Sequence, residues 1–99
     1  MAKLEQNYES VLVLSTKLGE EGIKAAVEKF TAMISEAAKL ESVDEWGKRR
    51  LAYAINYETE GYYVLFTFTS APAFPAELDR VYKITDGVLR SMIIAKEEN

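Results

Sequence analysis

A chain of 99 residues with 48% hydrophobic and 28% charged residues is expected to fold as one domain spanning residues 1–99. Its 12 basic and 16 acidic residues leave a formal net charge of −4, which disfavours broad, nonspecific binding to nucleic acid and requires any RNA contact to be local. Histidine and cysteine are absent, and with them the usual zinc ligands, thiol nucleophiles and near-neutral acid–base groups, so catalysis is disfavoured without being excluded and no metal or cofactor is expected.

The first ten residues, MAKLEQNYES, lack the basic and then apolar layout of a secretory signal. The longest apolar runs fall far short of the ~20 residues that span a bilayer. A cytoplasmic location without membrane contact is therefore expected.

Residues 8–15 (YESVLVLS) predict a strand in the interior of a sheet, because apolar side chains point to both of its faces. Residues 16–22 carry turn residues and two glutamates that favour the start of a helix. Residues 23–40 then predict a long amphipathic helix, whose apolar stripe is interpreted as core packing and not as a ligand site. That stripe consists of Ile23, Ala26, Val27, Phe30, Met33, Ile34, Ala37 and Leu40.

Two strands are predicted in the middle of the chain, at residues 42–57 and 62–70. The polar residues 58–61, which end in glycine, are expected to connect them as a hairpin. The second strand alternates most clearly, so Tyr62 and Tyr63 are expected on opposite faces.

A break at residues 71–75 precedes a second helix, for which Pro75 suits the first position and which is expected to run to about residue 85. Asp-Gly ends this helix, and residues 88–95 predict the last strand. The order β-α-β-β-α-β is typical of the ferredoxin-like α+β fold, a four-stranded antiparallel sheet with two helices on one face. The first and last strands, apolar on both faces, are expected to be the better-protected strands.

The stretch Lys48-Arg49-Arg50 is the main candidate for a nucleic-acid contact. It lies close to Trp46 and Tyr53, and no acidic residue interrupts residues 46–57. Arginines beside aromatic rings suit phosphate contact and base stacking. Consecutive strand residues point to opposite faces, so the three form no flat patch unless a bulge or turn at Gly47 intervenes. On the residues alone, a solvated strand edge guarded by charge is the favoured interpretation.

Two further features are weaker candidates. Residues 61–66 (GYYVLF) superficially resemble the aromatic RNP1 motif of RNA-recognition domains, but Glu60 stands where a basic residue is expected and the aromatic spacing is shifted by one. Packing in the core or against a partner is therefore favoured over base stacking. The remaining acidic candidates show no paired arrangement that acid–base chemistry needs, and solvated surface is favoured for them. They are Glu9, Asp44, Glu45, Asp79 and Asp86.

Four segments together resemble one known family. They are Tyr8-Glu9, the run WGKRRLAY at residues 46–53, Gly61-Tyr62-Tyr63, and the run DGVLRSMI at residues 86–93. The chain is similar to the bacterial small-subunit ribosomal protein six family over residues 8–95, with the segments in the family's order and separations. The G-x-R-R-L-A-Y core is the specific part of the match.

The resemblance implies a ferredoxin-like fold and a structural role in the small ribosomal subunit. It also implies binding to the central domain of small-subunit rRNA jointly with small-subunit ribosomal protein eighteen, and no small-molecule substrate. The family's basic pair falls on Arg49 and Arg50, with Lys48 before it and Tyr53 after it, and these four are the expected RNA contacts. Further contacts, with either the RNA or the protein partner, are expected at Trp46, Tyr8, Tyr62 and Arg90, and the role of Arg90 stays open.

The sequence departs from the family at two positions. Gln6 and Asn7 stand where many members carry basic residues, which puts an N-terminal RNA contact in doubt. Ala54 stands where proline is usual, so the strand can donate a hydrogen bond at that position.

Two other classes of function, an enzyme and a small-molecule-binding module, remain as alternatives. An enzymatic α+β-barrel dimer would need a pocket roofed by its sheet, and an acylphosphatase would need a phosphate-cradling loop, which the residues before the first helix do not form. A small-molecule-binding regulatory module is usually one domain of a longer chain, whereas the ends at Met1 and Asn99 are expected to be those of a complete one.

Overall fold

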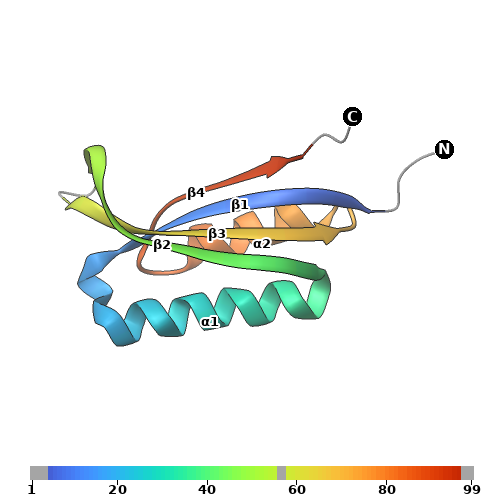
Figure 1. Ribbon diagram of the computed structural model, residues 1–99, viewed down its shortest axis with the longest axis horizontal. Coiled ribbons are helices and arrows are strands. Elements are labelled where there is room, and N and C mark those ends of the chain that lie inside the picture. Colours follow the sequence, from blue (N-terminus) through green and yellow to red (C-terminus); the bar gives the residue numbers. More distant parts are fainter. Residues whose placement is uncertain (1–4, 56–57, 97–99) are drawn as a thin grey trace.

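The chain forms the elements of a ferredoxin-like fold in the expected order β-α-β-β-α-β in a computed structural model, which describes residues 5–55 and 58–96 (Figure 1). A single turn of 3-10 helix, η1, follows the first strand. The elements are β1 (Gln6–Ser15), η1 (Thr16–Leu18), α1 (Gly19–Ala37), β2 (Lys39–Ile55), β3 (Glu58–Ser70), α2 (Phe74–Ile84) and β4 (Val88–Ala95).

The strands form one antiparallel sheet in the order β2-β3-β1-β4. The interior position predicted for β1 is confirmed, whereas the protected position predicted for β4 is wrong. β4 is an edge strand, on which Met92 and Ile94 are 50% and 48% exposed. Apolar character on both faces of β4 does not require a neighbour on both sides, because strand order is set by the connections and not by composition.

Both helices cover the same face of the sheet, and the core lies between these two layers (Figure 1). Phe30 of α1 meets Tyr82 of α2 edge to face, with ring centroids 4.7 Å apart. The residues that point to the helices from Tyr8 to Leu14 of β1 and from Val64 to Ser70 of β3 are at most 7% exposed. The buried core consists of Tyr8, Leu12, Leu14, Ile23, Val27, Phe30, Ile34, Val64, Phe66, Phe68, Leu78 and Tyr82.

Several element boundaries differ from the prediction, most clearly the end of α1 and the start of β3. α1 ends at Ala37 and not at Leu40, because Leu40 already belongs to β2, where it pairs with Phe68. Residues 58–61 are not a connector: they begin β3, and Glu60 pairs with Arg50. β2 and β3 pair up to Ile55 and Glu58, and residues 56–57 between them lie outside the described residues, as does the alternation expected at Tyr57.

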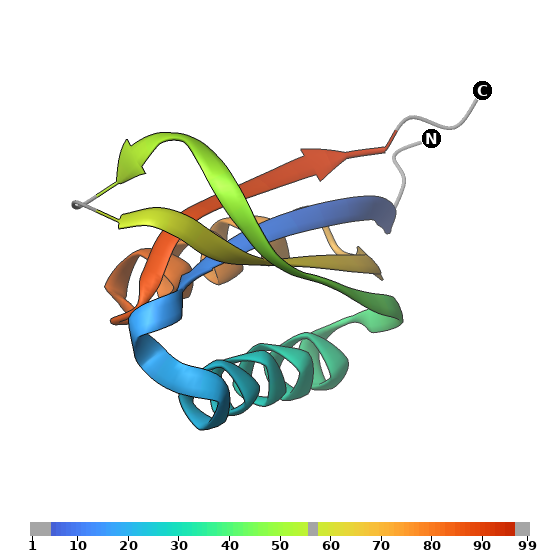
Figure 2. The ribbon, with the colours of Figure 1, turned by 60° about the vertical axis from the view of Figure 1, so that its left-hand side comes forward.

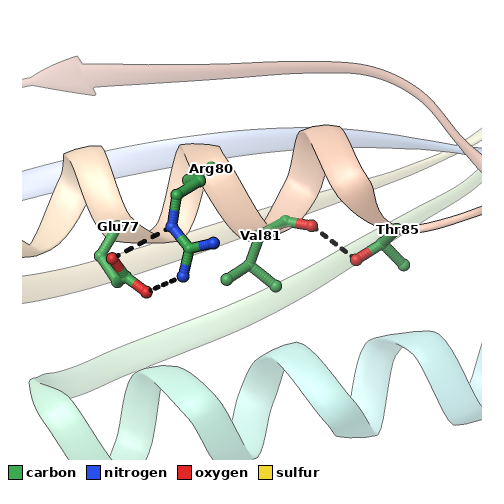
Figure 3. A network of polar contacts seen from close by, with 4 residues as sticks. All are labelled: Glu77, Arg80, Val81 and Thr85. Atoms are coloured by element: carbon green, nitrogen blue, oxygen red, sulfur yellow. Dashed lines mark hydrogen bonds and ion pairs between the residues drawn. The ribbon is translucent and has the colours of Figure 1, made fainter.

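Polar contacts define the two ends of α2 (Figure 3). Pro75 occupies the first turn as expected, and Glu77 forms an ion pair with Arg80. At the other end, the Thr85 hydroxyl donates a hydrogen bond to the Val81 carbonyl at 2.6 Å. These contacts belong to the helix layer, which covers the sheet face opposite to the open one. In the part of the chain that the structure describes, neither helix has the length and apolar character to span a membrane.

The C-terminal part of β2 curls out of the plane of the sheet, on the side away from the helices (Figure 2). The curl brings Leu51 over Gly61 of β3, and Leu51 is only 8% exposed as a result. A Cβ at position 61 would lie 2.4 Å from Cγ1 of Val13 and 3.4 Å from Cδ2 of Leu51. Glycine at position 61 therefore lets β2 close over this end of the sheet.

Candidate nucleic-acid interface

A β-bulge in β2 shapes the surface that the basic stretch was predicted to form. Glu45 pairs with Val64 and Gly47 pairs with Tyr63, so Trp46 is an extra residue without a partner opposite it. Gly47 has a φ of 84°, a conformation in which glycine carries no steric penalty. The bulge that the sequence allowed at Gly47 is present, but it brings Trp46, and not a second residue of the basic stretch, to the face of Arg49.

Trp46 is held by three contacts on the open face of the sheet. Its indole N–H donates to Oδ2 of Asp44 at 2.9 Å. Its ring stacks on Tyr63 with centroids 6.3 Å apart and an interplanar angle of 16°. The Arg49 guanidinium lies 5.8 Å from the Trp46 ring centroid, within the range of a cation–π contact. Because of the bulge, the Trp46 ring lies between the Tyr63 ring and the Arg49 guanidinium in one set of contacts.

A second aromatic–arginine pair joins the two edge strands. The Arg90 guanidinium of β4 lies 5.8 Å from the ring centroid of Tyr53 of β2, although β3 and β1 separate these strands in the sheet. Arg90 reaches the open face because it pairs with Val13, whose side chain also points away from the helices. The C-terminal part of β2, which curls out of the sheet (Figure 2), carries the Tyr53 ring that Arg90 meets.

We call Trp46, Arg49, Tyr53, Tyr63 and Arg90 the aromatic–arginine cluster. A hollow of about 210 Å³ opens beside it in the same sheet face. The hollow is lined by Val11, Val13, Tyr63, Arg90, Ser91 and Met92. The open face thus combines exposed rings, two cations and an apolar floor.

The other two basic residues of the stretch belong to the opposite side of β2. Lys48 pairs with Tyr62 and lines a separate hollow of about 450 Å³ together with Glu20 and Lys24 of α1. Arg50 shares the side of Lys48, because the register of residues 48–50 is regular. The basic stretch is therefore divided, with Arg49 alone on the cluster's face, in agreement with the alternation expected of a strand.

Two tyrosines expected as contacts lie away from the cluster. Tyr62 points to the helix side, where its hydroxyl donates to Oε1 of Glu45 at 2.8 Å. This hydrogen bond to a carboxylate raises the pKa of Tyr62 above its ordinary value. Tyr8 is 7% exposed and stacks on Phe68 with ring centroids 5.7 Å apart, so it packs in the core and offers almost no surface for a contact.

Two residues of the open face were not among the predicted contacts. Tyr63 was assigned to the face opposite Tyr62 without a role, and Asp44 was grouped with the solvated acids. Strand alternation alone places Tyr63 on the open face, but only the bulge shows that Trp46 stacks on it. The other acids stay apart as expected: Glu45 accepts from Tyr62, and Asp79 pairs with Lys83.

Fold and sequence together define a small ferredoxin-like protein of the ribosome. The family model described as ribosomal protein S6 matches residues 7–95, and the chain belongs to this family. The small ribosomal subunit protein bS6 of Clostridium novyi is 50% identical over 94 residues, which cover 94% of this chain and 99% of that protein. The protein of the same name from Clostridium botulinum is 50% identical over 93 residues, covering 93% and 99%.

Solved structures agree with this assignment. The crystal structure of 30S ribosomal protein S6 from Thermotoga maritima superposes with a TM-score of 0.88 at 28% identity, covering 93% of this chain and 88% of that one. The C-terminal domain of the MgtC protein from Mycobacterium tuberculosis reaches a TM-score of 0.57 at 17% identity, covering 98% and 94%, which shows a shared fold alone. The family membership confirms the expectation of a ribosomal protein and not an enzyme.

Proposed function

We propose that this protein is a structural component of the small ribosomal subunit in the cytoplasm. There it binds the central domain of small-subunit rRNA jointly with small-subunit ribosomal protein eighteen. The observation that carries this proposal is the family match over residues 7–95, together with relatives named as small ribosomal subunit proteins. The aromatic–arginine cluster supplies the chemistry for RNA that an acidic chain otherwise lacks.

The cluster is the proposed centre of the RNA contact. Arg49 and Arg90 present cations on one face, and Trp46 and Tyr53 present rings that are 39% and 61% exposed. A guanidinium stacked on a ring keeps its N–H edge available for a phosphate, which it can bind with two parallel hydrogen bonds. Lys48 and Arg50 are proposed as outer phosphate contacts, reached where the RNA passes round the edge of β2.

The net charge of −4 favours joint binding with a basic partner. A few arginines on one face give few phosphate contacts, and the 16 acidic residues repel RNA elsewhere. A basic partner supplies the remaining phosphate contacts, and charge complementarity speeds its encounter with this protein. The protein alone is therefore expected to bind the rRNA fragment far more weakly than the pair.

The proposal is tested by assembling the protein, protein eighteen and a central-domain rRNA fragment at several salt concentrations. Arg49→Ala combined with Arg50→Ala is expected to weaken assembly and to reduce the slope of log K against log salt by about 0.9 for each phosphate that the variant no longer neutralises. The fold is expected to stay intact, because both side chains are exposed.

Arg80→Ala is the matched control, since it removes one exposed arginine on α2 whose partner is Glu77 (Figure 3). This variant is expected to keep the wild-type slope. The single variants Arg49→Ala and Arg50→Ala then separate the two sides of β2, and Arg49→Ala is expected to have the larger effect. An unchanged salt slope in the double variant would overturn the proposed RNA contact.

A further inference from the structure

We propose that the hollow in the open sheet face holds an unpaired base of single-stranded RNA, with the flanking phosphates on Arg49 and Arg90. The hollow is the one lined by Val11, Val13, Tyr63, Arg90, Ser91 and Met92. This inference rests on the proposed function and deepens it, because it names the form of RNA that the cluster recognises.

The lining of the hollow suits a base better than a backbone. Val11 and Val13 make its floor apolar, and Tyr63 and Met92 extend the apolar surface up the sides. A phosphate or a ribose would lose hydration against such a floor without gaining hydrogen bonds. A base presents flat apolar faces, which stack on aromatic rings and on guanidinium planes.

The cations lie where the backbone on either side of a held base would pass. Arg90 is a wall of the hollow and stacks on Tyr53, whereas Arg49 stacks on Trp46, whose ring in turn stacks on Tyr63 of the opposite wall. Each guanidinium is oriented by a ring before RNA arrives, so little side-chain freedom is lost on binding.

Carboxylates oppose the contact along the rest of the open face, and one of them, Asp44, lies at the cluster itself, where it accepts the Trp46 indole N–H. Glu9 of β1 lies further along the same face, where it pairs with Thr67 and Ile94. Glu41 of β2 lies there also, accepting a hydrogen bond from Thr69. These carboxylates repel a backbone that follows the strands, so the RNA is expected to cross the face at the cluster and to place one or a few nucleotides there.

Unpaired RNA is favoured over a duplex for the same reason. A helical RNA presents phosphates, ribose hydroxyls and a shallow minor groove, and its base faces are hidden in the stack. It can approach Arg49 and Arg90 but cannot place a base on Val11 and Val13. A protein partner covering the face would bury the two arginines, whose charges then require acidic groups opposite them.

The chain provides its own reporter for this test, since Trp46 is its single tryptophan. Tryptophan fluorescence is titrated at low salt with a short unstructured RNA strand, with the same strand in a perfect duplex, and with inorganic tripolyphosphate. The single strand is expected to quench Trp46, because a stacked base lies against the Tyr63–Trp46 pair. The duplex and tripolyphosphate are expected to leave the emission nearly unchanged.

Two variants probe the hollow itself. Val11→Phe fills the floor from a half-buried position, and Tyr63→Leu removes one wall; Tyr62→Leu is the matched control on the helix side. Each hollow variant is expected to lower the affinity for the single strand about tenfold, the loss typical of one base–aromatic stack. Circular dichroism verifies that each variant is folded. If Tyr63→Leu unfolds, the affinity of Val11→Phe for the single strand still tests the hollow.

The outcomes distinguish this inference from the proposed function. Equal quenching by duplex and single strand, or hollow variants that bind the single strand normally, would overturn the base site while joint assembly with rRNA and protein eighteen still proceeds. Quenching of Trp46 by protein eighteen alone, with the single strand excluded, would also overturn it and assign the face to protein. Failure of the wild-type pair to bind the rRNA fragment would instead overturn the proposed function.

Discussion

At the scale of single residues, the core contains one polar contact that joins the sheet to the helix layer. The hydroxyls of Ser10 and Tyr82 lie 2.9 Å apart, and both residues are fully buried. Among the described residues no buried side-chain nitrogen or oxygen is left without a partner. Each hydroxyl therefore depends on the other for its hydrogen bond.

This pairing predicts a strongly non-additive mutant cycle. Tyr82→Phe or Ser10→Ala alone leaves one buried hydroxyl unsatisfied and is expected to lower the free energy of unfolding by about 1–3 kcal/mol. The double variant removes both hydroxyls, so its destabilisation is expected to fall well below the sum of the two single effects. Urea denaturation of the four proteins measures the coupling, and additive effects would show that the hydrogen bond is not formed.

The same hydrogen-bonded pair has a consequence at alkaline pH. Burial raises the pKa of Tyr82 above its ordinary value of about 10. The folded state therefore holds this proton more tightly than the unfolded chain does. The stability from Tyr82 is fully present below pH ~10 and is lost as the pH rises above it. Tyr82→Phe is expected to remove this part of the alkaline destabilisation, which urea denaturation at several pH values measures.

The sequence correctly predicted that consecutive basic side chains point to opposite faces of the strand, but it did not predict which side chains contact one another. Alternation placed Lys48 and Arg49 on different sides of a strand, as the structure shows. It could not place Trp46 beside Arg49, because an odd separation in a regular strand puts them on opposite faces. Tyr8 was expected as a contact from its place in a family motif, and only the packing against Phe68 shows that it belongs to the core.

At the scale of elements, β2 differs most from a regular strand. The sequence predicted its existence and allowed a bulge at Gly47. The curl and the passage of Leu51 over Gly61 depend on cross-strand packing that local pattern does not contain. The helices were easier to predict, because the 3.6-residue stripe and Pro75 are local signals.

The bulge predicts a graded response at position 47. Gly47→Ala places a Cβ at a φ of 84°, and is expected to cost about 1–2 kcal/mol of stability even though the space around it is open. Gly47→Asn is expected to cost less, because asparagine tolerates positive φ. Thermal unfolding ranks the variants, and near-ultraviolet circular dichroism detects the displacement of Trp46. An alanine variant as stable as the wild type would show that the bulge relaxes.

At the scale of the whole molecule, the two sheet edges have opposite characters. The edge formed by β2 carries many charged side chains, whereas β4 carries Arg90 as its single charge. Charged side chains protect an edge strand against pairing with another chain. The β4 edge is thus the less protected of the two.

This asymmetry predicts that the isolated protein self-associates through β4 at high concentration or on heating. Met92→Lys combined with Ile94→Lys is expected to reduce this association without loss of fold, because both side chains are about half exposed. Ser42→Lys on the β2 edge is the control, where an added lysine is expected to change little. Light scattering against concentration measures the effect, and equal association of all three proteins would exclude the β4 edge.

The fold could be predicted from sequence to a greater extent than the candidate site. Strand and helix order follow from periodicity, and the order β-α-β-β-α-β restricts the topology to few solutions. The candidate site depends on how the strands lie relative to one another. Arg90 meets Tyr53 only because β2 curls across the two strands between them. No local pattern in either segment contains this information.

The Tyr53–Arg90 contact also bears on how the molecule folds. Tyr53 belongs to the first β-α-β half of the chain, and Arg90 belongs to the second. The contact therefore exists only after both halves have docked and the long-range pairing of the sheet is complete, which is the slow part of forming such a topology. A chain with one half misfolded carries the same arginines but cannot assemble the surface. The proposed RNA contact would thus form only in a completely folded molecule, and an incompletely folded chain would lack it.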